Sequence, residues 1–194
     1  MKLVVGLGNP GLDYAFSRHN IGYWVVEEFA RRMGWTDDFP RDAKHKFDGE
    51  ALGGMVGNQR VLVLEPTTYM NLSGRSVQAA MAFYQLAPQD VMVVLDDLAL
   101  PCGKLRIRPG GSDGGHNGLR DIARALGTSD YPRLRVGIDP PPPRVPGKDY
   151  VLGKFTEEQR KLLEPAIARA TGAIATWIDE GITTAMNRFN ADVG

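Results

Sequence analysis

Lys2-Leu-Val-Val-Gly-Leu-Gly-Asn-Pro-Gly11 is the stretch that decides the fold, because a short apolar run ends there in a glycine-rich loop. Apolar runs of this length that are stopped by glycines are typical of buried strands. Beyond the loop, residues 20–33 carry apolar side chains at helical spacing, and Gly34 lies where a helix often ends in glycine. A strand, a loop and a helix in this order predict an α/β architecture.

Strand and helix patterns continue to alternate along the chain. The sequence predicts strands at residues 48–53, 60–64, 91–95, 104–108 and 134–138, and helices at residues 73–86 and 119–126. Thr156 and Gln159 match a capping box that begins a helix, and a longer helix is expected from Pro165 to Asn187. The proline-rich residues 139–148 are expected to form a surface loop. We therefore predict one α/β domain over residues 1–194 with a mixed sheet.

The composition is that of an ordinary globular protein, and it excludes several classes. Lys and Arg total 23 of the 194 residues and Asp and Glu also total 23, so only a local basic patch can bind nucleic acid. Cys102 is the single cysteine, which excludes an internal disulfide, disfavours structural zinc and fits a reducing cytoplasmic compartment. Because the sequence has no apolar run of about 18–20 residues, we expect no membrane span.

His19 and Asp96 are the main candidates for catalysis. His19 lies between the glycine-rich loop and the first predicted helix, and Asp96 follows the most apolar predicted strand. Since α/β sheets place their sites at the carboxyl ends of strands, the two side chains would meet if their strands are parallel neighbours. A carboxylate that orients an imidazole supports a general base. Asp97 is the competing carboxylate, and a histidine satisfied by local hydrogen bonds is the alternative for His19.

Asparagines follow three different predicted strands. Asn9, Asn71 and Asn117 would converge on one cleft, where neutral amides suit a carbonyl, an amide or an attacking water. Asn20 is assigned to helix capping. The three histidines lack ligand spacing to one another, and the chain lacks a Gly-x-Ser-x-Gly elbow. We therefore expect a metal-free reaction that uses water directly.

The pattern Gly6-x-Gly8-x-x-Gly11 offers an alternative, because it matches the dinucleotide-binding fingerprint of an oxidoreductase. In that fingerprint the third glycine opens the helix whose N-terminus takes the pyrophosphate. Here Pro10 and a further loop separate the glycines from the helix pattern. A tight turn that needs glycine geometry is the simpler interpretation.

A local excess of basic residues lies between residues 103 and 136. Seven basic residues stand there against three acidic ones in an otherwise neutral chain. Arg106 and Arg108 share one face of a predicted strand, and Arg133 and Arg135 share a face of another. Either a phosphate clamp or a strand edge kept soluble by charge explains this pattern.

Several long motifs occur in the order that is typical of the bacterial peptidyl-tRNA hydrolase family, and the whole chain resembles that family. The motifs are Gly6-Leu-Gly-Asn-Pro-Gly11, Arg18-His-Asn-x-Gly22, Thr68-Tyr-Met-Asn-Leu-Ser-Gly74, Asp96-Asp-Leu with Pro101, Gly110-Gly-Ser-Asp-Gly-Gly-His-Asn-Gly-Leu119, Arg133-Leu-Arg-Val-Gly-Ile138 and Tyr150-Val-Leu-Gly153. The resemblance implies a single domain in which a mixed, twisted sheet lies between helices as a three-layer sandwich. It also implies a cytoplasmic, monomeric enzyme without cofactor or metal.

The implied activity is hydrolysis of the ester between a peptide and tRNA, which returns tRNA to translation after ribosome rescue. By resemblance, His19 is the general base that activates water and Asp96 is its partner. The resemblance places these residues at the substrate cleft: Asn9, Tyr14, Tyr69, Met70, Asn71, His116 and Asn117. It assigns the grip on tRNA phosphate to Lys104, Arg106, Arg108, Arg133 and Arg135. The alternative within this fold is an RNA-binding protein without catalysis, which would keep the basic patch and could dispense with the His–Asp pair.

Overall fold

The computed structural model describes residues 1–191, and its strands form one sheet in the order β2-β3-β4-β1-β5-β7-β6. The central strands β4, β1, β5 and β7 are parallel, whereas β3 and β6 run antiparallel to their neighbours. The sheet is therefore mixed, as predicted. The strands are β1 (Lys2–Gly6), β2 (Lys44–Lys46), β3 (Gly49–Val56), β4 (Gln59–Pro66), β5 (Val91–Asp97), β6 (Leu105–Arg108) and β7 (Arg133–Gly137).

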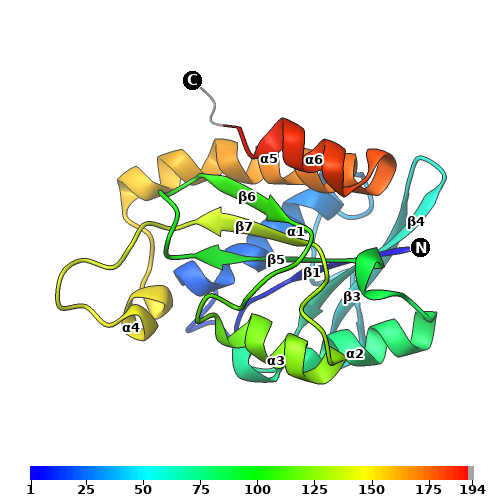
Figure 1. Ribbon diagram of the computed structural model, residues 1–194, viewed down its shortest axis with the longest axis horizontal. Helices are drawn as coiled ribbons and strands as arrows, with labels where there is room; N and C mark the ends of the chain where they lie inside the picture. The colour runs from blue at the N-terminus through cyan, green and yellow to red at the C-terminus, as the bar shows by residue number, and fades with distance from the viewer. Residues whose placement is uncertain (192–194) are drawn as a thin grey trace.

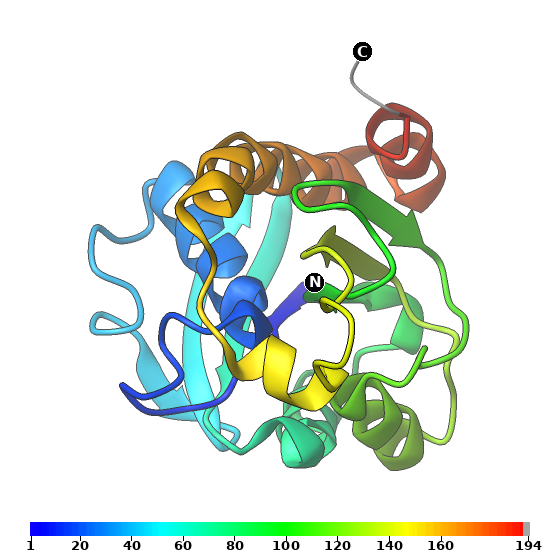
Figure 2. The ribbon, with the colours of Figure 1, turned by 90° about the vertical axis from the view of Figure 1, so that its left-hand side faces the viewer.

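Helices cover both faces of the sheet and make the predicted three-layer sandwich (Figure 1). One face carries α1 (Ile21–Arg32), α5 (Glu157–Glu180) and α6 (Ile182–Phe189), and the other carries α2 (Ser73–Tyr84) and α3 (Asn117–Leu126). The short helix α4 (Gly147–Leu152) lies apart from both layers, at the end of the sheet that faces the viewer in Figure 2. Three 3-10 turns complete the set: η1 (Arg18–Asn20), η2 (Met70–Leu72) and η3 (Pro88–Asp90).

Alternation along the central strands builds a core on each face. Val4 and Val94 pack toward α1 and α5, whereas Val5 and Val93 pack toward α2 and α3, and all four are fully buried. Side chains of successive strand residues point to opposite faces, so a strand that is apolar throughout must be covered on both sides. This explains why β1 and β5 have the most continuous apolar sequences.

Gly22 lets the first helix approach the first strand closely. A Cβ atom there would lie 2.4 Å from the backbone nitrogen of Leu7 and 2.5 Å from the backbone oxygen of Val94. No real side chain tolerates such distances, so glycine is required. The close contact fixes α1, and the turn η1 before it, against the ends of β1 and β5.

Three elements differ from the sequence predictions. The strand β2 was missed, because its Lys-His-Lys sequence carries no apolar signal. Helix α4 was missed because it begins at Gly147, directly after the proline run. The predicted break before Pro165 is wrong: α5 runs through that residue and ends only at Gly181, whose φ is 87°. A continuous buried face, from Leu163 through Ile178, holds the helix together across the proline.

Candidate active site

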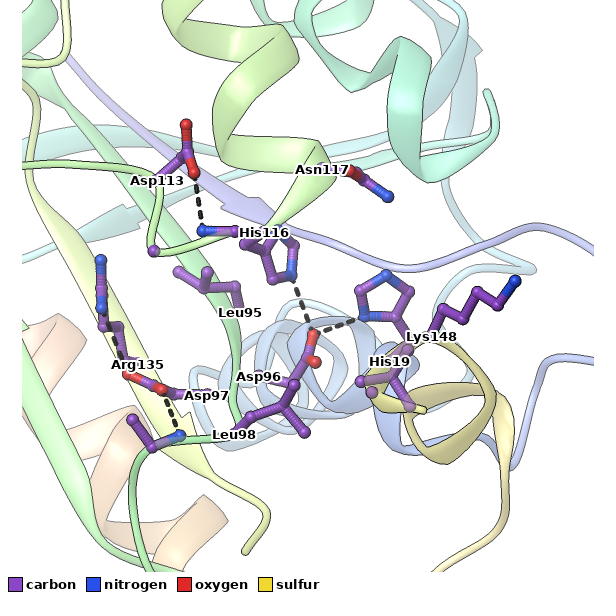
Figure 3. A pocket seen from close by; sticks show the side chains of 15 residues that line it. His19, Leu95, Asp96, Asp97, Leu98, Asp113, His116, Asn117, Arg135 and Lys148 are labelled. Atoms are coloured by element: carbon purple, nitrogen blue, oxygen red, sulfur yellow. Dashed lines mark hydrogen bonds and ion pairs between the residues drawn. The ribbon is translucent and has the colours of Figure 1, made fainter. Parts of the chain in front are cut away.

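The parallel neighbours β1 and β5 bring His19 and Asp96 together, as the sequence predicted. Asp96 lies near the carboxyl end of β5, and His19 lies in η1, which follows the loop after β1. The His19 Nδ1 atom lies 2.8 Å from Asp96 Oδ1 (Figure 3). Both residues are buried, with 8% and 3% of their surface exposed. Asp97, the competing carboxylate, contacts Arg135 on the other face of the strand.

His116 is a second partner of the same carboxylate. Its Nε2 atom lies 3.0 Å from Asp96 Oδ1, and its ring centre lies 4.9 Å from that of His19. The Nδ1 atom of His116 accepts a hydrogen bond from the backbone N–H of Leu119, at the start of α3. The proton of a neutral His116 therefore sits on Nε2, and it is donated to Asp96.

Asp96 is held in its charged form. Burial alone would raise the pKa of this carboxyl, but the electrostatic attraction of the His19 and His116 rings and the hydrogen bonds that they make to it outweigh burial and lower it. The carboxylate then accepts the Nδ1–H of His19, so Nε2 of His19 is left as the nitrogen that can take a proton. This is the arrangement that a general base requires.

The atoms of His19, Asp96 and His116 that face one another all lie within 4.8 Å, a spacing that could also hold a metal ion. Sequence spacing gave no sign of this cluster, because the three residues are distant in the chain. A metal would need lone pairs on His19 Nδ1 and His116 Nε2. The N–H of Leu119 assigns the lone pair of His116 to the opposite nitrogen, so the donor set fits hydrogen bonding to Asp96 better than metal binding.

A cavity of about 310 Å³ opens beside the His–Asp–His cluster. Its walls come from the end of β5, the glycine-rich segment before α3, and helix α4. The charged and polar residues that line it are His19, Asp96, Asp97, Asp113, His116, Asn117, Arg135 and Lys148 (Figure 3).

The predicted asparagines occupy different positions around this cavity. Asn117 is exposed and lines it, and its Oδ1 atom accepts a long bond of 3.5 Å from Arg120. Asn9 is buried, and its Oδ1 atom accepts from the backbone N–H of Met70 at 2.8 Å. Asn71 is exposed on the adjacent turn η2.

Asn20 occupies the N-cap position of α1 but makes no side-chain cap, contrary to the prediction. Its Oδ1 accepts from the backbone N–H of Asn9 at 2.9 Å, and its Nδ2 donates to the Asn9 carbonyl oxygen at 2.9 Å. Asn20 therefore fixes the loop after β1 relative to η1.

The remaining residues that resemblance assigned to the cleft differ in exposure. Met70 is 4% exposed, and its sulfur packs closely against Gly118 of α3. Tyr69 is 57% exposed, and Tyr14 is half-buried in the loop after β1. The loop between Gly11 and η1 also separates the glycine pattern from α1, so the geometry of a dinucleotide fingerprint is absent from this segment.

The four predicted arginines of β6 and β7 share one face of the sheet. Arg106 lies opposite Arg135 and Arg108 lies opposite Arg133 in the antiparallel register. Residues directly opposite point to the same side, so the two strands make a single row of positive charge. Lys104, which is half-buried, precedes β6.

Two of these arginines are committed to contacts within the protein. Arg133 is 1% exposed, and its guanidinium donates to the backbone oxygens of Ser112 and Ser129 at 2.9 and 2.7 Å. A phosphate therefore cannot reach Arg133, because the loop segments that carry Ser112 and Ser129 cover its guanidinium. Arg135 pairs with Asp97 at 3.3 Å and donates to the Ser112 oxygen at 3.0 Å. Arg108 is exposed, and Arg106 is half-buried.

Fold and site together define an α/β protein with a buried histidine–carboxylate pair that lines a cavity, the type of site that activates water. A family model described as peptidyl-tRNA hydrolase matches residues 3–193. The chain belongs to the peptidyl-tRNA hydrolase family.

Individual relatives agree with the family model over the whole chain. The peptidyl-tRNA hydrolase of Rhodopirellula baltica is 48% identical over 194 residues, which cover 100% of both chains. That of Chloroflexus aggregans is 47% identical, covering 98% of this chain and 99% of its own. The crystal structure of peptidyl-tRNA hydrolase from Acinetobacter baumannii has a TM-score of 0.88 and 38% identity, over 98% of this chain and 95% of that one.

Within residues 1–191, every helix is too short or too polar to cross a bilayer.

Proposed function

We propose that this protein hydrolyses the ester that joins a peptide to tRNA, with His19 as the general base. The observation that carries the proposal is the His19–Asp96 contact of 2.8 Å at the cavity, in a chain that belongs to the peptidyl-tRNA hydrolase family. The reaction releases free tRNA for reuse in translation.

His19 and Asp96 supply the proton transfers. The Nε2 atom of His19 takes a proton from water as the water oxygen bonds to the ester carbonyl carbon. Asp96 stabilises the imidazolium that forms, because its carboxylate faces the Nδ1–H. The ester C–O bond then breaks, and the imidazolium returns the proton to the ribose oxygen that leaves. The reaction consumes one water molecule, and its products are the free peptide acid and the tRNA hydroxyl.

Asn117 is the asparagine best placed to stabilise the oxyanion. It is exposed and lines the cavity, and its Oδ1 atom is turned toward Arg120, which leaves the Nδ2 donors for the substrate. Asn9 acts by holding η2 through Met70, and Asn71 and Tyr69 of that segment would meet the peptide. Neutral donors that bind backbone groups rather than side chains allow many peptides to be accepted.

The row of positive charge on β6 and β7 would contact tRNA phosphates through Arg108 and Arg106, together with Lys104 just before β6, whereas Arg135 stays paired with Asp97 at the inner end of the row. Arg133 supports the row from beneath. Affinity for tRNA should therefore fall with salt, because counterions are released on binding. We also propose that the enzyme acts as a monomer, which gel filtration of the purified protein would test. Its proposed place of action is the cytoplasm.

The test is release of free tRNA from an N-blocked aminoacyl-tRNA in the presence of EDTA. Wild-type protein should release tRNA, whereas His19→Ala should lose at least about a hundredfold in kcat while it still binds tRNA. Near-normal hydrolysis by His19→Ala would remove that residue from the mechanism. If both proteins bound tRNA in a salt-dependent way and neither released it, the non-catalytic RNA-binding alternative would replace the proposal.

A further inference from the structure

The cavity beside His19 has an unfavourable charge for a nucleotide substrate. Three aspartates line it: Asp96, Asp97 and Asp113. The pKa of Asp113 is lowered by a hydrogen bond from the backbone N–H of Gly115 and by Arg120, so this carboxyl is charged as well. A substrate that brings a phosphate to this cavity therefore needs a cation there.

Two cationic side chains line the cavity, Arg135 and Lys148, and Arg135 already pairs with groups of the protein. Arg135 pairs with Asp97 at 3.3 Å and donates to the backbone oxygen of Ser112 at 3.0 Å. Lys148 is exposed, and none of the carboxylates in residues 1–191 lies within ion-pair distance of its ammonium. Lys148 thus offers three hydrogen-bond donors that have no acceptor within residues 1–191.

Helix α4 holds Lys148 at a fixed place relative to His19. The guanidinium of Arg18, the residue before His19, lies 4.0 Å from the ring centre of Tyr150 and donates to the Tyr150 backbone oxygen at 3.1 Å. The Tyr150 hydroxyl donates to the Ile138 oxygen at 2.8 Å. In Figure 3, Lys148 lies on the His19 side of the cavity, away from Arg135.

We propose that Lys148 binds the phosphate that joins the last two nucleotides of the tRNA. This inference rests on the proposed function, in which the ester carbon lies at His19 and that phosphate lies one ribose away. Lys148 is then a substrate-binding residue that recognises the nucleotide part, separate from the row of positive charge on β6 and β7. A lysine suits this role because its ammonium is a mobile point charge that needs no fixed orientation.

Two small esters separate this role from catalysis. One is an N-acetyl-aminoacyl ester of adenosine, which has no phosphate, and the other is the same ester of the dinucleotide cytidylyl-adenosine, which has one. Lys148→Gln should lower kcat/KM about tenfold on the dinucleotide ester, chiefly through KM, and leave the adenosine ester unchanged. Lys148→Arg should restore most of the loss. Arg144→Gln is the matched control, because it removes an exposed cation of the preceding loop that does not line the cavity.

An equal loss of kcat/KM on both esters would overturn the proposal. The adenosine ester has no phosphate, so such a loss would mean that Lys148 affects the catalytic site itself and does not bind the phosphate. Unchanged rates on both esters would also overturn it. Binding of the unesterified dinucleotide, followed by calorimetry, provides a readout that does not depend on hydrolysis. Lys148→Gln should weaken that binding, and equal affinity would refute the role of Lys148 even if the proposed ester hydrolysis failed.

Discussion

A glutamate pair between α1 and β4 makes the stability of this protein depend on pH. Glu65 of β4 is 3% exposed, and its Oε1 atom lacks a hydrogen-bond partner within residues 1–191. Burial, Glu27 and Glu50 raise its pKa well above the ordinary value. Burial also raises the pKa of Glu27 from 4.5 to about 7. The carboxyls therefore hold protons that the unfolded chain has already lost.

The sign and the size of the effect follow from linkage. Between pH 4.5 and 7 the native state keeps the Glu27 proton and the unfolded state does not, so the free energy of unfolding falls as pH rises through this window. A shift of this size corresponds to about 3 kcal/mol at 1.36 kcal/mol per pKa unit. The stabilisation is fully present below pH 4.5 and is absent above about pH 7.

Glu27→Gln tests this, because the amide cannot ionise. Urea unfolding followed by tryptophan fluorescence, at intervals from pH 5 to pH 8, should show the variant gaining about 2–3 kcal/mol relative to wild type toward pH 8. Glu28→Gln is the control on the same helix, because the pKa of Glu28 is lowered by its bond to Arg31. Wild-type and Glu27→Gln curves that run parallel over this range would refute the reasoning.

Further predictions concern the site and the packing. Asp96→Asn should lower kcat about a thousandfold while tRNA affinity, measured by filter binding, is retained, because the charged partner of the imidazole is lost. Gly22→Ala should destabilise the fold by about 3 kcal/mol in urea unfolding, because its Cβ would lie 2.4 Å from the Leu7 nitrogen. Arg133→Ala should lower the free energy of unfolding by more than it lowers the free energy of tRNA binding, since the Arg133 guanidinium holds two loop carbonyls. Arg108→Ala should leave stability unchanged and reduce the salt dependence of tRNA binding by about one counterion.

Local patterns in the sequence predict most of the fold. The continuous apolar runs of β1 and β5 are visible because both faces of those strands are covered. The continuity of α5 through Pro165 was not predicted, because a buried helical face outweighs the local effect of the proline and only the tertiary packing of α5 shows this. The strand β2 depends on pairing with β3 rather than on its own residues.

The sequence predicted only those parts of the candidate site that depend on strand order, and it missed the parts that depend on how loops fold. His19 and Asp96 could be paired from the sequence because each follows a strand, and the order of parallel strands brings such positions together. The contact of His116 with the same oxygen depends on how the glycine-rich segment folds back before α3, which residue spacing does not specify. The burial of Arg133 likewise depends on loop carbonyls that close over it.

Arg18 joins the N-terminal part of the chain to residues 150–159 beside the site. Its backbone N–H donates to the Gly153 oxygen at 2.9 Å, and its guanidinium donates to Gln159 at the start of α5 at 3.1 Å. The turn that holds His19 is thus completed by residues synthesised some 130 positions later. During its own translation, this protein can complete the turn at His19 only after α4 and the start of α5 have been synthesised. We therefore expect an enzyme that clears unfinished chains from tRNA to stay inactive until its own chain extends through the start of α5.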